Sequence, residues 1–107
     1  MSRTKDEILH DALTHFETTQ AYADRDLDDQ LVIDAICMRI SAGIETLATL
    51  GPDVRDHLFG KDWPLMWGMR NRIAHGYLLI DADIVRATLR RDVPGIIQHI
   101  RDGLSPG

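Results

Sequence analysis

The sequence lacks the features that several large classes of protein require. It has one cysteine, Cys37, among 107 residues, which excludes a disulfide framework and a zinc site built from several cysteines. No apolar run approaches the ~18 residues of a membrane-spanning helix. The first residues carry charges but not the apolar stretch of a secretory signal. We therefore expect a cytoplasmic protein without a membrane partner, folded as a single domain over residues 1–107.

Signatures of metal and phosphate-loop sites are also missing. No pair among the five histidines has the His-Glu-x-x-His spacing of a zinc site, and no glycine-rich phosphate loop occurs. The acidic cluster at positions 24–29 lacks the glycine and the distal glutamate of a calcium-binding loop, so a solvated turn is expected there. We expect neither a metal ion nor a cofactor.

Charge is divided unevenly along the chain. The net charge is −5, which argues against a general coat for nucleic acid. Residues 1–49 carry 4 Lys and Arg against 10 Asp and Glu, whereas residues 50–107 carry 8 against 7. An anionic ligand should therefore bind in the second half, although the arginines there can equally lie on solvated helix faces. These arginines are Arg70, Arg72, Arg86, Arg90 and Arg91.

What the sequence does contain is 44% hydrophobic residues, largely at helical spacing. A first helix should begin at Thr4, which forms a capping box with Glu7. The second long helix has the clearest apolar stripe, and its additional apolar residues, including Leu31 and Met38, suggest burial on two sides, against the bundle and against another subunit. The first stripe is Ile8, Leu9, Ala12, Leu13 and Phe16, and the second is Ile33, Ile36, Ile40, Ile44 and Leu47.

Glycine, proline and aspartate mark the remaining helix boundaries. A short third helix is predicted from Pro52 to near Gly60, and a fourth from Pro64 to Gly76. Asp81 or Asp83 should cap a fifth helix, with Ile84, Val85 and Leu89 as its apolar residues. Pro94 must either kink this helix or restart it after an Asp92 cap. Short connections between such helices predict an all-α, antiparallel up-and-down bundle of four to five helices.

One segment, residues 68–77, combines several polar side chains with a helix end. At about 100° per residue, Asn71 and His75 differ by about 40° and share a helix face, whereas Arg70 and His75 differ by about 140°. Histidine changes its charge near neutrality, which makes His75 a candidate for proton transfer. A histidine near a helix C-terminus is also often only structural.

The same segment resembles a known family. Arg70, His75 and Tyr77 match the Arg-x-x-x-x-His-x-Tyr signature of HepT-like toxins in the HEPN superfamily. Residues on either side also fit the family's pattern, with the resemblance covering roughly residues 4–104; they are Trp63, Gly68, Met69, Asn71, Arg72, Gly76, Asp81, Ile84, Val85, Asp92 and Pro94. One stretch departs from the pattern, because Ile44-Glu45-Thr46 stands where the family often has Gly-Glu-Ala; only Glu45 is retained.

The resemblance implies a metal-independent endoribonuclease that works as a homodimer, with the motifs of both subunits lining one cleft. RNA, such as tRNA or mRNA, carries its own nucleophile in the 2′-hydroxyl. In this interpretation His75 transfers protons and Arg70 binds the scissile phosphate. Asn71 and Arg72 are the candidate substrate-binding residues beside them.

The resemblance also implies a partner. Such toxins belong to toxin–antitoxin pairs like those of type II and type VII, and a minimal nucleotidyltransferase antitoxin transfers AMP to the tyrosine of the motif, here Tyr77. The alternative for Tyr77 is a ring that simply packs at the helix end. The alternative for the whole chain is a non-catalytic HEPN-like module that binds and assists a nucleotidyltransferase.

Three more residues are expected to be structural. Trp63 and Trp67, four positions apart, are more typical of a core or a dimer anchor than of a platform for bases. Cys37 lies inside the apolar second helix, which predicts a buried and unreactive thiol.

Overall fold

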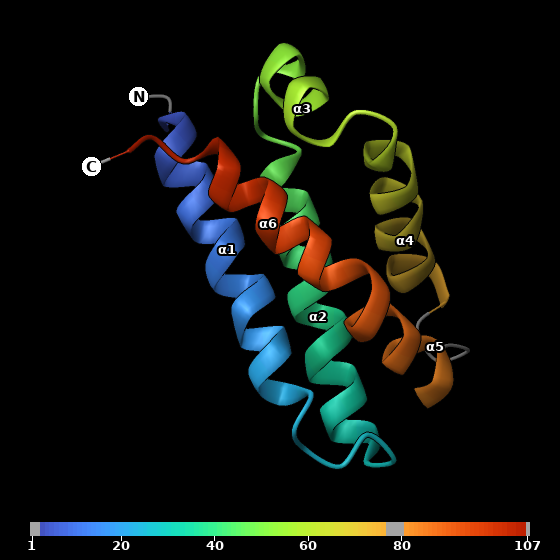
Figure 1. The fold of residues 1–107 in the computed structure, drawn as a ribbon. Helices are drawn as coiled ribbons and strands as arrows, with labels where there is room; N and C mark the ends of the chain where they lie inside the picture. The colour runs from blue at the N-terminus through green and yellow to red at the C-terminus, as the bar shows by residue number, and fades with distance from the viewer. Residues whose placement is uncertain (1–2, 77–80, 107) are drawn as a thin grey trace.

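Two long antiparallel helices form one side of the molecule (Figure 1). The computed structural model describes residues 3–76 and 81–106, and the regular elements within these ranges are all helical. Helix α1 spans Lys5–Tyr22 and α2 spans Gln30–Leu47. The predicted capping box is confirmed, because the Glu7 amide donates to the Thr4 hydroxyl while the Thr4 amide donates to the Glu7 carboxylate. The hydrogen bond that the Thr4 amide donates to the carboxylate is the main cause of a lowered pKa at Glu7.

A short helix then turns the chain back along α2. Helix α3 spans Pro52–Phe59 and follows Gly51, as predicted. Helix α4 spans Asp62–Gly76 and packs against α2. It begins two residues before Pro64, so the prediction that proline opens this helix was wrong. Pro64 is tolerated because the first turn of a helix leaves its backbone N–H groups without partners inside the helix.

The last part of the chain is one continuous helical segment with a π-turn inside it. Helix α5 spans Ala82–Ala87 with Asp81 as its N-cap, the π-helix η2 spans Thr88–Asp92, and α6 spans Val93–Gly103. The Val93 amide donates to the Thr88 carbonyl five residues before it, which widens the helix just ahead of Pro94. The Asp92 side chain makes no capping hydrogen bond and the helix continues through the π-turn, so the chain does not restart after an Asp92 cap.

The core lies where α1, α2 and α6 meet, with α4 on the far side of α2 from α1 (Figure 1). The predicted stripe of α2 is confirmed, since all five of its residues are buried. In α1, Leu13 is half-buried and the other four predicted residues are buried. The largest side chains that are fully enclosed are Phe16, Leu9, Ile36, Ile44, Leu47 and Ile100. The fold is therefore the predicted all-α helical bundle.

The described residues, 3–76 and 81–106, leave the second apolar side of α2 uncovered. Leu31 and Met38 are 75% and 72% exposed, seven residues apart on one face of the helix. Ile84, one of the apolar residues expected on the fifth helix, is 49% exposed on α5. Cys37 is buried as predicted, and burial together with the nearby Asp34 raises the pKa of its thiol, which disfavours the reactive thiolate. No helix among the described residues has the length and apolar character needed to cross a membrane.

Gly43 allows α1 and α2 to approach closely, and this yields a stability prediction. A Cβ atom at position 43 would lie 2.7 Å from Cε2 of the fully buried Phe16. We expect Gly43→Ala to lower the free energy of unfolding by about 1–2 kcal/mol, because overpacking outweighs the gain in helix propensity. At Gly68, also helical, a Cβ would meet no atom within 4 Å, so Gly68→Ala should raise stability by about 0.5–1 kcal/mol. Urea denaturation of both variants checks this; a stabilised Gly43→Ala would contradict it.

Candidate functional site

Arg70 is held on three sides at the edge where α4 meets α2. Its Nε and Nη2 groups donate to Oε1 of Glu45 at 2.8 and 2.7 Å, and Nη1 donates to Oδ1 of Asn71 at 3.0 Å. The guanidinium carbon lies 5.0 Å from the centre of the Trp67 ring, within the range of a cation–π contact. The Arg70 side chain is 25% exposed and that of Glu45 is 49% exposed. An ion pair with this exposure adds little stability, so its main effect is to fix the direction of the guanidinium.

The Arg70–Trp67 contact is one end of a longer stack. The Trp67 and Trp63 rings are stacked with centres 5.9 Å apart, and the guanidinium of Arg55 on α3 lies 4.9 Å from the Trp63 ring centre. Phe59 contacts Trp63 from α3, with ring centres 6.2 Å apart. Both tryptophans are half-buried and pack against the core, which agrees with their predicted structural role. We call Arg55, Trp63, Trp67 and Arg70 the cation–indole column.

His75 lies in the last turn of α4 with an exposed side chain. Five residues of helix place it about 7.5 Å along the axis from Arg70. Arg70 and His75 both lie in the part of the chain that the structure describes, and no hydrogen bond joins their side chains. Among the described residues, the Asn71 side chain accepts a hydrogen bond from Arg70 and makes none with His75. The structure therefore brings Arg70, Asn71 and Glu45 together and leaves the imidazole outside that cluster. Tyr77 lies outside the described residues.

A shallow hollow runs between α2 and α4 beside this cluster. Its volume is about 530 Å³, and Glu45 and Ala74 line it together with the exposed Met38. Ala74 lies about 40° around the helix from Arg70 and next to His75 in the sequence. The hollow thus joins the Arg70–Glu45 pair to the uncovered apolar face of α2.

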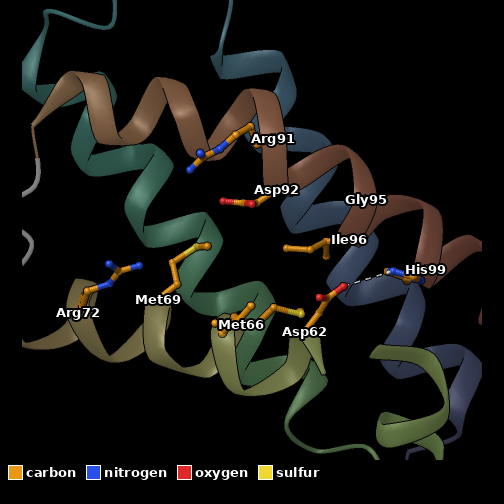
Figure 2. A pocket seen from close by; sticks show the side chains of 10 residues that line it. Asp62, Met66, Met69, Arg72, Arg91, Asp92, Gly95, Ile96 and His99 are labelled. Atoms are coloured by element: carbon orange, nitrogen blue, oxygen red, sulfur yellow. Dashed lines mark ion pairs between the residues drawn. The ribbon is translucent and has the colours of Figure 1, made fainter. Parts of the chain in front are cut away.

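Arg72 lies on a different side of α4. It lines a pocket of about 330 Å³ between α4 and the η2–α6 segment, in which Met66 and Met69 face Arg91 and Ile96 (Figure 2). At the far end of this pocket, His99 Nε2 is 3.7 Å from Oδ2 of Asp62. Two residues of helix turn a side chain by about 200°, which explains why neighbours in the motif point to opposite sides. The structure therefore does not group Arg72 with Arg70 and Asn71.

Two parts of this site were missed by reasoning from the sequence. Glu45 was noted only as a retained family residue, although it is the strongest partner of Arg70. The signal that could have found it is its position, because an acidic residue seven positions after Met38 continues the non-core face of α2. Arg55 had no signal, since its contact with Trp63 depends on the angle between α3 and α4.

Comparison with known proteins identifies the family. A family model described as ribonuclease HepT-like matches residues 7–102. The chain belongs to this family. The match covers all of α2–α5 and most of α1 and α6, and it includes the three residues of the Arg-x-x-x-x-His-x-Tyr signature. The resemblance expected from the sequence is thus confirmed for the HepT-like family as a whole, which is named for ribonuclease activity. Comparisons with curated proteins and with solved structures find no significant match.

Proposed function

We propose that this HepT-like chain is a metal-independent endoribonuclease and the toxin of a toxin–antitoxin pair. The observation that carries the proposal is the placement of the motif: Arg70 is fixed at the α2–α4 edge, and His75 is exposed on the same helix about 7.5 Å further along. A fixed guanidinium can stabilise the negative charge that develops on the phosphate, and an accessible imidazole can transfer a proton without a metal ion.

The reaction follows from the chemistry of RNA. The 2′-hydroxyl attacks the adjacent phosphorus, the bond to the 5′-oxygen breaks, and a 2′,3′-cyclic phosphate is left. His75 takes the proton of the 2′-hydroxyl or gives one to the leaving oxygen, and Arg70 binds the phosphate oxygens as negative charge develops. Asn71 holds Arg70 from one side through its Oδ1 atom. Arg72 is proposed to contact RNA away from the scissile phosphate, because it projects from another side of α4.

A homodimer is part of the proposal. One imidazole cannot readily serve as base and acid on opposite sides of one phosphorus, whereas two copies related by a two-fold axis can share these roles. The support in the structure is the uncovered apolar face of α2 with Leu31 and Met38, which borders the hollow beside Arg70 and Glu45. A second copy bound there would bring two Arg70–His75 motifs to one cleft.

The assay that tests the activity is cleavage of single-stranded RNA by the purified chain in the presence of a chelator. We expect cleavage that persists with EDTA, products ending in 2′,3′-cyclic phosphate, and no cleavage of an oligonucleotide with 2′-O-methyl groups throughout. Loss of activity on chelation that added magnesium restores, or products with a 3′-hydroxyl end, would contradict the proposal.

The proposed partner is a minimal nucleotidyltransferase antitoxin that transfers AMP to Tyr77. The added phosphate carries negative charge two residues from His75 and repels RNA. We expect the peptide containing Tyr77 to gain the mass of one adenylate, about 329 Da by the arithmetic of AMP transfer with loss of water, when both proteins are co-expressed. Tyr77→Phe should abolish this gain. A neutralised toxin with an unmodified peptide would instead indicate inhibition by complex formation.

The Arg70–Glu45 pair favours a second candidate function. The carboxylate offsets the charge of the arginine in the free chain, as expected for a non-catalytic module that binds and assists a nucleotidyltransferase. Growth distinguishes the two: expression of the chain alone arrests a host if it is a toxin, and Arg70→Ala relieves the arrest. A host that grows normally with the wild-type chain favours the non-catalytic module.

A further inference from the structure

The cation–indole column ends in two arginines with different surroundings. Arg70 at one end binds Glu45 through two nitrogens. Arg55 at the other end, on α3, has no carboxylate of the described residues within 4 Å. The one acidic residue of α4, Asp62, lies beside His99, with 3.7 Å between Oδ2 of Asp62 and Nε2 of His99. The positive charge of Arg55 is therefore less compensated than that of Arg70.

Arg55 also carries a polar atom that folding leaves without a partner. Its Nε is buried and forms no hydrogen bond with any described residue. A buried unsatisfied donor opposes folding, so its presence in a half-buried side chain calls for an explanation. The contact with Trp63 is part of that explanation, because an indole holds the guanidinium of Arg55 in place. The Nη groups of the guanidinium then stay available for an anion.

The two tryptophans set the separation between the arginines. Their rings are stacked with 28° between the planes, and each ring contacts one guanidinium, that of Arg55 at Trp63 and that of Arg70 at Trp67. Each indole is already in contact with a second ring and with a guanidinium, which leaves less of its surface for stacking with a base. The column is therefore suited to contact the backbone of a nucleic acid, with one phosphate at each end, and not to read its bases.

We propose that Arg55 is a second phosphate-binding residue, placed by the Trp63–Trp67 stack at a fixed distance from Arg70 so that one RNA strand contacts both guanidinium groups. The inference rests on the proposed function and names how that same site holds its substrate. Arg55 binds a phosphate remote from the scissile one, and contributes to affinity and to the register of the strand without taking part in proton transfer.

The test is binding of a single-stranded 2′-O-methyl RNA oligonucleotide, which cannot be cleaved, measured by fluorescence anisotropy across a series of salt concentrations. Arg55→Gln removes the charge and the guanidinium and leaves a shorter polar side chain. We expect it to weaken binding by roughly tenfold or more and to reduce the slope of log Kd against log salt by about 0.7, the value for one phosphate contact on a single strand. Arg55→Lys keeps the charge and should retain the slope.

Arg25→Ala is the matched control, because Arg25 is exposed in the α1–α2 connection at the opposite end of the molecule from α3 (Figure 1). It should leave affinity and slope close to those of the wild-type chain. In cleavage assays Arg55→Gln should raise KM for a long RNA and leave kcat unchanged, and it should not alter cleavage of a dinucleotide that is too short to reach Arg55.

The outcomes separate this inference from the proposed function. If the wild-type chain cleaves RNA and Arg55→Gln binds with unchanged affinity and slope, the inference is overturned and the ribonuclease proposal stands. If binding depends on Arg55 but purified wild-type chain never cleaves RNA, the phosphate contact stands and the ribonuclease proposal fails. If the wild-type chain does not bind the oligonucleotide at all, the inference is overturned. Circular dichroism of Arg55→Gln and Arg55→Lys establishes that the compared variants are folded.

Discussion

His75→Ala is expected to lower kcat for RNA cleavage by roughly 10²–10⁴-fold, the usual contribution of a general acid or base. The side chain is exposed in the last turn of α4 and contributes nothing to the core, so its loss should leave the fold unchanged. The measurement is single-turnover cleavage of a labelled RNA, together with the helical circular dichroism signal and the thermal midpoint of the same preparation.

His10→Ala is the control for this prediction, since His10 is an exposed histidine on α1 and is absent from the proposed site. It should cleave RNA at the wild-type rate. Purified His75→Ala that cleaves RNA at full rate would remove the proton-transfer role from His75. A variant that loses both activity and helical structure would instead assign a structural role to this position.

The second large effect concerns Arg70. Arg70→Ala should lower kcat by about 10²–10³-fold, the range found when one donor to a developing negative charge is removed. Arg70→Lys should recover only a small part of this loss, because an ammonium group cannot bind Glu45 through two nitrogens, reach Asn71 and lie against Trp67 at the same time. Separate kcat and KM values for both variants, with the thermal midpoint as a check on folding, test this prediction.

Glu45→Gln should change RNA binding in the direction opposite to the Arg70 variants. The amide oxygen can still accept a hydrogen bond from Arg70, but the negative charge that competes with phosphate is gone. RNA should therefore bind more tightly to Glu45→Gln than to the wild-type chain, with a steeper dependence on salt. Weaker binding by Glu45→Gln would show that the carboxylate is needed to hold the arginine in its binding direction. If Arg70→Lys cleaved RNA as fast as the wild-type chain, the role assigned to the guanidinium of Arg70 would be overturned, because a positive charge alone would suffice.

The parts of the fold that follow from local chemistry could be predicted from the sequence. The Thr4–Glu7 capping box and the buried stripe of α2 depend on residues within one helix, and both are confirmed. Pro94 required an irregular helix, but the sequence left a kink and a restart open, because the choice depends on whether five residues can form a π-turn. The start of α4 was misplaced because a proline fits several positions of the first turn.

The candidate site was predictable only in part, for a similar reason. The motif supplied Arg70, Asn71 and His75, all on one helix, and simple helix geometry indicates that Arg72 points elsewhere. Glu45 is 25 residues from Arg70 and reaches it only because α2 and α4 pack together. Arg55 depends on a third helix as well. Contacts between helices are set by the packing of whole surfaces, which a single sequence does not reveal.

The π-turn at Thr88–Asp92 has a consequence for how length changes are tolerated here. It accommodates one more residue than a regular α-helical turn would, and so sets the rotational phase between α5 and α6. Removing a single residue from it would restore a regular α-helical turn and keep that phase, whereas removing one at the start of α6 would turn everything downstream by about 100°. Ile97 and Ile100 would then turn toward solvent, and Gln98 and Arg101 would take their places in the core. A deletion of one residue should therefore be tolerated better in this stretch than in the regular parts of α5 and α6.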